Sequence, residues 1–175
     1  LGDIRAQFSA YAVATKKLLV LLEEENLNDL DLIISNILQK SEESMRKKIS
    51  EIPDGKYYDE MLVDGFENPL IIKCMIEIKK DKIKVDFTGT SQQINRPINS
   101  VFNYTYAYAC YALKCAIDPN APNNDGSFRT ITIKAPEGTI VNPRRPAPVW
   151  GRHLTGHYIP PAIYGALSKV IPNKV

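Results

Sequence analysis

The chain has 175 residues, of which 44% are hydrophobic and 24% are charged, a composition typical of globular proteins that excludes disorder and fibrous repeats. A domain of this length can bury roughly 70% of the surface that its unfolded chain exposes. The net charge is +2 without a block of like charge, and no apolar run reaches the roughly 20 residues that span a bilayer, so we expect neither a nucleic-acid partner nor a membrane partner.

Two helices are predicted at the start of the chain. Hydrophobic residues recur at helical spacing over residues 2–25 and again from Asn28 to about Glu51. Asp3 is placed to cap the first helix. The short link at residues 26–28 predicts that the two helices form an antiparallel helical hairpin, and we interpret this pair, residues 1–52, as scaffold.

The hydrophobic period changes to two after Gly55, which is typical of strands. Strands are predicted at Lys56–Val63, Pro69–Lys79 and Lys82–Phe87, with turn residues between them. The second and third of these strands are close enough along the chain to form a hairpin. We therefore expect an antiparallel β-sheet.

A helix rich in aromatic residues is predicted from Ser100 to Ile117, with Asn99 as its cap. Its tyrosines point around much of the circumference, which predicts a buried helix. A strand at Phe128–Lys134 and a C-terminal helix at about Pro161–Val170 follow. Helices and strands without βαβ alternation predict an α+β fold.

The whole chain, residues 1–175, is expected to be a single domain or a fragment of a larger subunit. Within it, residues 53–175 form the part that mixes sheet and helices. The starting Leu1 and the stop at Val175, directly after a helical pattern, favour a fragment.

The three cysteines are Cys74, Cys110 and Cys115, and no CxxC pair is present to hold zinc. An odd number of cysteines without a signal peptide favours a reducing compartment, so we expect a cytoplasmic protein. Free cysteine behaves as a small hydrophobic residue, and we expect all three to pack in the core.

Arg152, His153 and His157 form the densest group of side chains that can do chemistry, because they bring together both histidines of the chain and an arginine. Prolines and glycines crowd the segment, so a regular helix is not expected and the histidine spacing does not predict a metal site. An imidazole beside a guanidinium suits a carboxylate or a polarised carbonyl. We predict that this segment faces a cleft on the substrate side, and that it binds no metal.

Asp86, Asn99 and Asn124 are further candidates for contacts with a substrate. Asp86 begins the segment Asp-Phe-Thr-Gly-Thr-Ser, whose hydroxyls and N–H groups could cradle an anion, and the two asparagines lie in amide-rich loops. The alternative for all three is structural, because these residue types also build turns by bonding to nearby backbone. No phosphate-binding loop of the G-x-x-x-x-G-K-[ST] type occurs, so no ATP site is predicted in this chain.

Several short motifs occur in an order that resembles the hydantoinase B family, and the resemblance covers essentially all of the chain. The motifs are Gly2-Asp3-Ile4-Arg5-Ala6-Gln7, Pro53-Asp54-Gly55-Lys56-Tyr57, Val85-Asp86-Phe87-Thr88-Gly89-Thr90-Ser91 with Gln93, Pro97-Ile98-Asn99, Pro122-Asn123-Asn124-Asp125-Gly126, Ala135-Pro136-Glu137-Gly138-Thr139 with Asn142-Pro143, and Gly165-Ala166-Leu167 through Pro172.

This resemblance implies a part in the ATP-dependent opening of a cyclic amide, such as a hydantoin or 5-oxoproline. It implies a partner subunit or domain of the hydantoinase A type that binds ATP, and a divalent metal bound by family motifs outside this segment. The segment alone is then expected to be inactive, to bind no cofactor and to lack the catalytic residues. Two alternatives stay open: part of an acetone or acetophenone carboxylase subunit, and a non-catalytic module that only bridges subunits, which the aromatic helix and the prolines at 143–148 would suit.

Overall fold

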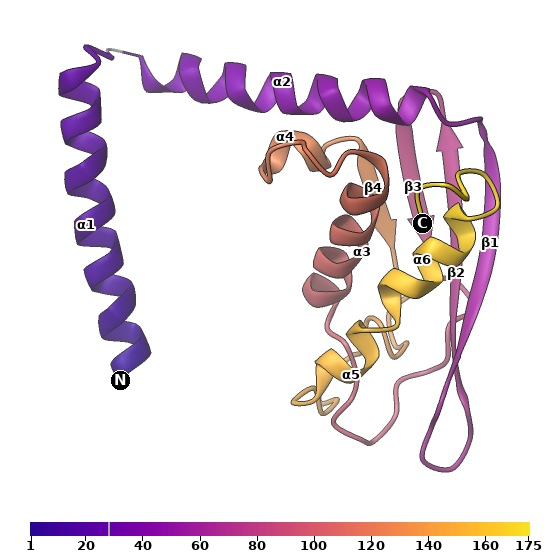
Figure 1. Ribbon diagram of the computed structural model, residues 1–175. Coiled ribbons are helices and arrows are strands. Elements are labelled where there is room, and N and C mark those ends of the chain that lie inside the picture. Colours follow the sequence, from indigo (N-terminus) through magenta and orange to yellow (C-terminus); the bar gives the residue numbers. More distant parts are fainter. Residues whose placement is uncertain (28) are drawn as a thin grey trace. The chain divides into compact units, whose positions relative to one another are not determined.

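A computed structural model describes residues 1–27 and 29–175 of the chain (Figure 1). Its contacts divide the chain into two compact units, Leu1–Ile37 and Leu38–Val175. The division falls inside the second helix, and the domain organisation of the chain stays a prediction.

The first helix, α1, spans Gly2–Glu24 and buries none of its residues. Asp3 does not cap it: the cap position is Leu1, and no side chain makes a capping hydrogen bond there. Asp3 lies instead in the first turn, where its negative charge is favourable for the helix dipole. The predicted link at residues 26–28 includes Asn28, which lies outside the described residues, so the antiparallel pairing of the two helices stays a prediction.

The second helix, α2, spans Leu30–Ser50. Asp29 caps it, because its side chain accepts a hydrogen bond of 2.8 Å from the backbone N–H of Leu32. The later turns of α2 belong to the second unit and bury three residues spaced four apart, namely Ser41, Met45 and Ile49. This spacing places them on one face of the helix, which packs on the core.

The sheet contains four strands in the order β1-β2-β3-β4: Gly55–Val63, Leu70–Lys79, Lys82–Asp86 and Ile131–Lys134. The pairs β1–β2 and β2–β3 are antiparallel, as the sequence predicts, whereas β3 and β4 are parallel. The expectation of an antiparallel sheet is therefore wrong for its last strand. The reason is the connection, because a long crossover that contains helices allows β4 to return in the direction of β3.

One face of the sheet is covered by α6, Ile159–Leu167, which packs on β1 and β2 and lies beside α3, Phe102–Ile117 (Figure 1). The buried residues of β2 alternate along the strand and face these helices. Gly165 allows α6 to approach β1, because a Cβ atom at this position would collide with the carboxylate of Asp59. The fold is α+β, as predicted.

The aromatic residues of α3 are not the residues that it buries most deeply, contrary to the prediction of a buried aromatic helix. The exposed fraction is 36% for Tyr106 and 59% for Tyr111. The buried residues are mostly small: Thr105, Ala109, Cys110, Ala112, Leu113, Ala116 and Ile117. Small residues allow α3 to pack closely on its neighbours, and its most exposed aromatic rings are those of Tyr106 and Tyr111.

Two short helices were absent from the predicted elements. The first, α4, spans Asp125–Phe128, so the strand expected from Phe128 begins only at Ile131. The second, α5, spans Arg152–Gly156 in the segment that was expected to be irregular. Both are about one turn long, and such short pieces leave little periodic signal in a sequence.

Within the described residues, no helix is both long enough and apolar enough to cross a membrane.

Candidate functional site

Arg152, His153 and His157 lie at and just after α5, and all three side chains are exposed. The backbone N–H of His157 donates a hydrogen bond of 2.9 Å to the carbonyl of His153, which closes one helical turn. The two imidazole ring centres are therefore 6.1 Å apart. The expectation that no helix aligns the two histidines is wrong, because one turn is enough to bring them to the same side.

Helix α3 adds two tyrosines to this group. The rings of Tyr104 and Tyr108 stack with centres 4.7 Å apart, and the hydroxyl of Tyr104 donates to that of Tyr108 at 3.1 Å. The guanidinium of Arg152 lies 5.4 Å from the ring centre of Tyr104, and the ring of His157 lies 6.0 Å from that of Tyr108. These five residues, Tyr104, Tyr108, Arg152, His153 and His157, form a continuous row that we name the α5 site.

The α5 site offers hydrogen-bond donors, one of which is the positively charged guanidinium of Arg152. Among the described residues, no carboxylate pairs with Arg152, whose guanidinium makes a cation–π contact with Tyr104. The hydrogen bond to Tyr108 raises the pKa of Tyr104, so its phenol stays protonated at neutral pH. A planar carboxylate or an amide carbonyl is the kind of group that such donors bind.

His157 also borders a cavity of about 370 Å³. Residues from three parts of the chain line it: Asp64 and Phe66 after β1, Ile98, and Leu154, Thr155 and Tyr158 around α5. The volume falls within the range of small-molecule pockets. The α5 site therefore lies beside a hollow large enough for a small ring.

Asn99 does not face this hollow but holds the backbone that surrounds it. Its side chain is fully buried, and its amide nitrogen donates to the carbonyls of Ile94, Arg96 and Pro148 at 2.8 to 2.9 Å. Its amide oxygen accepts from the N–H of Ile94 at 3.0 Å. Asn99 is therefore not the cap of α3 that the sequence predicts, a position that Val101 occupies without a side-chain hydrogen bond.

The residues just before Asn99 attach α5 to the same loop. The carbonyl of Pro97 accepts from the N–H of Gly151, and the carbonyl of Ile98 accepts from the hydroxyl of Thr155. Thr155 is buried, so this bond lies in the interior. The loop at residues 97–99 thus fixes both ends of α5, and with them the three exposed side chains.

Asp86 lies at the end of β3 and is nearly buried. Its carboxylate accepts hydrogen bonds from the backbone N–H and the hydroxyl of Thr88, and it pairs with the ammonium of Lys134 at 3.0 Å. Burial opposes ionisation, but these bonds from Thr88 and Lys134 outweigh it and hold the pKa of Asp86 below its usual value. Asp86 borders a second cavity, of about 650 Å³, which no residue of the α5 site lines.

Asn124 caps α4. Its side-chain oxygen accepts from the N–H of Ser127 at 3.4 Å, and its nitrogen donates to the hydroxyl of Ser41 on α2 at 2.9 Å. The structure therefore gathers Arg152, His153 and His157 in one place. The other three candidates lie outside the α5 site and bond to nearby backbone and side chains, as the structural alternative expects: Asp86, Asn99 and Asn124.

Tyr104 and Tyr108 are the members of the α5 site that the sequence did not single out. Their spacing of four on a helix was the available signal, because residues at i and i+4 lie on the same face. That spacing does not reveal which face of α3 is exposed, and the segment that supplies Arg152 lies far away along the chain.

The described residues contain no group of three or more His, Cys, Asp or Glu side chains that could hold a metal ion. The family resemblance implies a divalent metal bound outside this segment, and we assign no chemical step here to a metal. His153 and His157 alone would supply two ligands, fewer than protein metal sites of the zinc type use.

Comparison with known proteins places the chain in a family. The sequence profile of hydantoinase B/oxoprolinase matches residues 1–175. A protein of Methanocaldococcus jannaschii is 38% identical over 182 residues, which cover 100% of this chain and 31% of that protein. The B-type subunit of a putative D-/L-hydantoinase from a Pseudomonas species is 31% identical over 188 residues, which cover 99% of this chain and 32% of that protein. The chain thus spans about a third of the length of these curated relatives.

Two solved structures share the fold. The ATP-dependent caprolactamase from Pseudomonas jessenii superposes with a TM-score of 0.89 at 24% identity, over 99% of this chain and 31% of that one. An acetone carboxylase superposes with a TM-score of 0.67 at 20% identity, over 76% of this chain and 20% of that one. At these identities the likeness shows the fold alone. Because the family profile covers every residue, the chain belongs to the hydantoinase B/oxoprolinase family.

Proposed function

We propose that this chain is a segment of the B-type subunit of an ATP-dependent enzyme that opens a cyclic amide. The observation that carries the proposal is the match of the hydantoinase B/oxoprolinase profile to every residue of the chain. One relative is a putative hydantoinase subunit, and a protein of the same fold is an ATP-dependent caprolactamase. Hydantoins and caprolactam are both cyclic amides.

In this proposal a partner subunit or domain of the hydantoinase A type binds ATP. The sequence offers no phosphate-binding loop that could do so. The ring-opening chemistry, and any divalent metal that assists it, is assigned to parts of the enzyme other than this chain, because its described residues contain no metal-ligand group.

The α5 site is proposed to contact the substrate. Hydrolysis of a cyclic amide breaks the bond between the carbonyl carbon and the ring nitrogen, and it converts the carbonyl into a carboxylate. Arg152 has no carboxylate partner among the described residues. His157 lines the 370 Å³ cavity, and the ring of His153 lies 6.1 Å from that of His157. A guanidinium binds a carboxylate more strongly than a neutral carbonyl, so this arrangement favours the opened product over the ring.

A cytoplasmic location remains part of the proposal. Its support is that Cys74, Cys110 and Cys115 are all free thiols, as is usual in a reducing compartment.

The test is an assay of the intact subunit mixed with its A-type partner, with Mg-ATP and, in separate reactions, hydantoin, 5-oxoproline or caprolactam. We expect loss of one cyclic amide together with release of ADP, and no turnover when ATP or the partner is omitted. Carboxylation of acetone or acetophenone with bicarbonate, in place of any ring opening, would contradict the proposal and favour the carboxylase alternative. Inactivity on every substrate, with subunit association intact, would favour the bridging module.

A further inference from the structure

The cavity of about 370 Å³ that His157 borders, which we name the α5 cavity, has mostly apolar walls. Two of the lining side chains, Val63 and Ile98, are buried in the core, whereas Phe66 and Leu154 are 61% and 51% exposed. Large apolar side chains that stay exposed around a hollow are stabilised when a ligand covers them. The α5 cavity is therefore suited to a hydrocarbon group.

The walls of the α5 cavity carry a carboxylate but, among the described residues, no Lys or Arg. The carboxylate belongs to Asp64, which is exposed and has no ion-pair partner in the part of the chain that the structure describes. The hydroxyl of Thr155 already donates to the carbonyl of Ile98. An anionic group in this cavity would thus meet no Lys or Arg and would be repelled by Asp64.

Two arginines near the cavity are engaged elsewhere. The guanidinium of Arg152 lies over the ring of Tyr104, and in the proposed function it takes the carbonyl that becomes a carboxylate. The guanidinium of Arg96 lies 5.0 Å from the ring centre of Phe66 and lines a neighbouring cavity of about 480 Å³, which Phe66 also lines. Neither arginine lines the α5 cavity, so neither is placed to neutralise a carboxylate inside it.

Phe66 is positioned by the tight turn at residues 64–69, which joins β1 to β2. A Cβ atom at Gly65 would lie 1.7 Å from the carbonyl oxygen of Asn68, so the turn requires glycine there. The turn and the cation–π contact with Arg96 favour one orientation of the Phe66 ring. Phe66 is therefore placed to set the size of the group that the cavity accepts.

We propose that the α5 cavity is the subsite for an uncharged, apolar ring or ring substituent of the cyclic amide, and that Phe66 and Asp64 set its specificity. This inference rests on the proposed function, because it requires a cyclic amide whose carbonyl lies at the α5 site. His157 belongs to both places, so a carbonyl at the α5 site puts the rest of a small ring beside the cavity. Lactams and hydantoins with hydrocarbon substituents fit this subsite, whereas 5-oxoproline, which carries a carboxylate on its ring, does not.

Two hydantoins of similar size test the preference for an uncharged group, namely 5-isobutylhydantoin and 5-carboxymethylhydantoin. They share the same ring and differ in whether the substituent ends in methyl groups or in a carboxylate. The assay uses the intact subunit with its A-type partner and Mg-ATP at about pH 8, where imidazoles are ordinarily neutral. The isobutyl compound should be opened with a kcat/KM at least about tenfold higher.

Asp64→Asn tests the origin of this discrimination. Removal of the negative charge should raise kcat/KM for the carboxymethyl compound roughly threefold or more relative to the isobutyl compound. Glu67→Gln is the matched control, because it removes a carboxylate from the same turn at a position that does not line the α5 cavity. This control should keep the wild-type ratio.

Phe66→Ala tests the apolar wall. Loss of the ring should lower kcat/KM for 5-isobutylhydantoin roughly tenfold and affect unsubstituted hydantoin less, whereas Phe66→Leu should retain most of the preference. Leu62→Ala is the control, because Leu62 is a similarly exposed apolar residue of β1 that does not line the cavity. It should turn over both compounds as the wild type does.

Three outcomes separate the claims. Equal kcat/KM for the two substituted hydantoins, or a preference for the carboxymethyl compound or 5-oxoproline, would overturn the inference and leave the proposed function standing. A preference for the isobutyl compound that persists in full in Phe66→Ala would also overturn the inference, since the specificity would then arise elsewhere. A wild-type enzyme that opens no cyclic amide would overturn both.

Discussion

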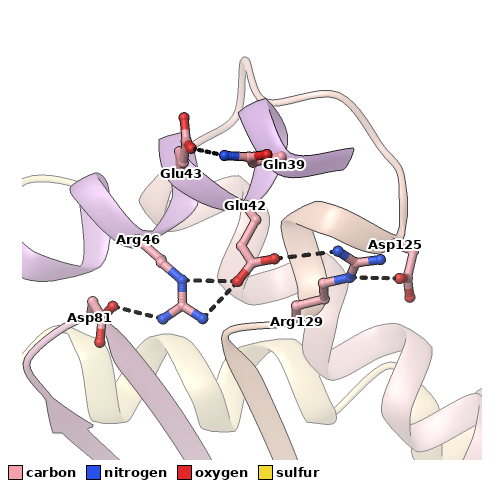
Figure 2. A network of polar contacts seen from close by, with 7 residues as sticks. All are labelled: Gln39, Glu42, Glu43, Arg46, Asp81, Asp125 and Arg129. Carbon is pink, nitrogen blue, oxygen red and sulfur yellow. Dashed lines mark hydrogen bonds and ion pairs between the residues drawn. The ribbon is translucent and has the colours of Figure 1, made fainter. Parts of the chain in front are cut away.

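The guanidinium of Arg46 on α2 donates a hydrogen bond of 2.7 Å to the carboxylate of Asp81 in the turn between β2 and β3. Arg46 also donates to Glu42 at 2.7 and 3.0 Å, and the second oxygen of Glu42 lies 3.4 Å from Arg129, which pairs with Asp125 of α4 (Figure 2). Charges alternate along this chain of contacts. It attaches the last turns of α2 to the hairpin and to α4.

Replacement of Arg46 by glutamine should loosen α2 without unfolding the sheet. The variant loses three charge-assisted hydrogen bonds, but the side chains are partly exposed, so the effect is small. We expect up to about fivefold faster amide hydrogen exchange in peptides that cover residues 40–50, measured in the intact protein.

Lys48→Gln is the control for this prediction. It removes the same charge from the same helix, but among residues 1–27 and 29–175 the one ion-pair partner of Lys48 is Glu51, one turn away. Its exchange should match that of the wild type. Equal exchange in all three proteins would show that the contacts with Asp81 and Glu42 do not stabilise α2.

Acid should abolish the difference between the wild type and Arg46→Gln. The hydrogen bond with Arg46 holds the pKa of Glu42 below its ordinary 4.5 and that of Asp81 below its ordinary 3.8. A carboxyl group whose pKa is lowered by folding stabilises the fold above its unfolded pKa, and this contribution is lost as pH falls through the folded pKa. We therefore expect a constant difference in exchange protection above about pH 5 and a shrinking one below about pH 4, after correction for intrinsic exchange rates. A difference that persists unchanged at about pH 2 would exclude these carboxylates as its source.

Asn99→Ala should release α5 from the loop that holds it. The substitution leaves a partly buried N–H and three partly buried carbonyls without their partner, at a cost of roughly 1–3 kcal/mol. Hydrogen exchange should accelerate in peptides that cover residues 94–101 and 148–158. Asn124→Ala, the control, removes a helix cap elsewhere and should affect α4 while leaving α5 unchanged. If α5 exchanges at the wild-type rate in Asn99→Ala, its position does not depend on this amide.

The cysteines should differ in reactivity, although the sequence predicted that all three are core residues. Burial raises the pKa of Cys74 to about 12 and that of Cys110 to about 11, whereas Cys115 is exposed. Because the thiolate is the reactive form, the first two should resist alkylation at about pH 8 and react only after denaturation. Fast native labelling of Cys74 or Cys110, followed peptide by peptide, would contradict their burial.

The strands were predictable because burial imposes a strict alternation on them. In β2, Ile72, Cys74, Ile76 and Ile78 all face the helices, and this period of two is visible in the sequence. The parallel pairing of β4 with β3 was not predictable, since it depends on the path of the chain through α3 and α4. Periodicity also could not show that α3 buries Ala109, Ala112 and Ala116 and leaves Tyr106 and Tyr111 exposed.

The candidate site was predictable to the extent that its residues are neighbours in sequence. Arg152, His153 and His157 fall within one short segment, and one helical turn brings them together. Tyr104 and Tyr108 join them only through tertiary packing. The role of Asn99 could not be predicted. An asparagine that is buried and holds a loop cannot be told by its residue type from an exposed asparagine that binds a ligand.

Contact between the α5 site and the substrate is tested most directly by the ATP-dependent turnover of a cyclic amide by the intact enzyme that carries Arg152→Ala. Loss of a charge-assisted contact with the substrate should lower kcat/KM by roughly 10- to 100-fold while metal content and subunit association stay unchanged. Arg145→Ala, which removes the same charge from an exposed position in the preceding loop, should retain wild-type turnover. If the enzyme with Arg152→Ala turns over at the wild-type rate, the α5 site does not contact the substrate.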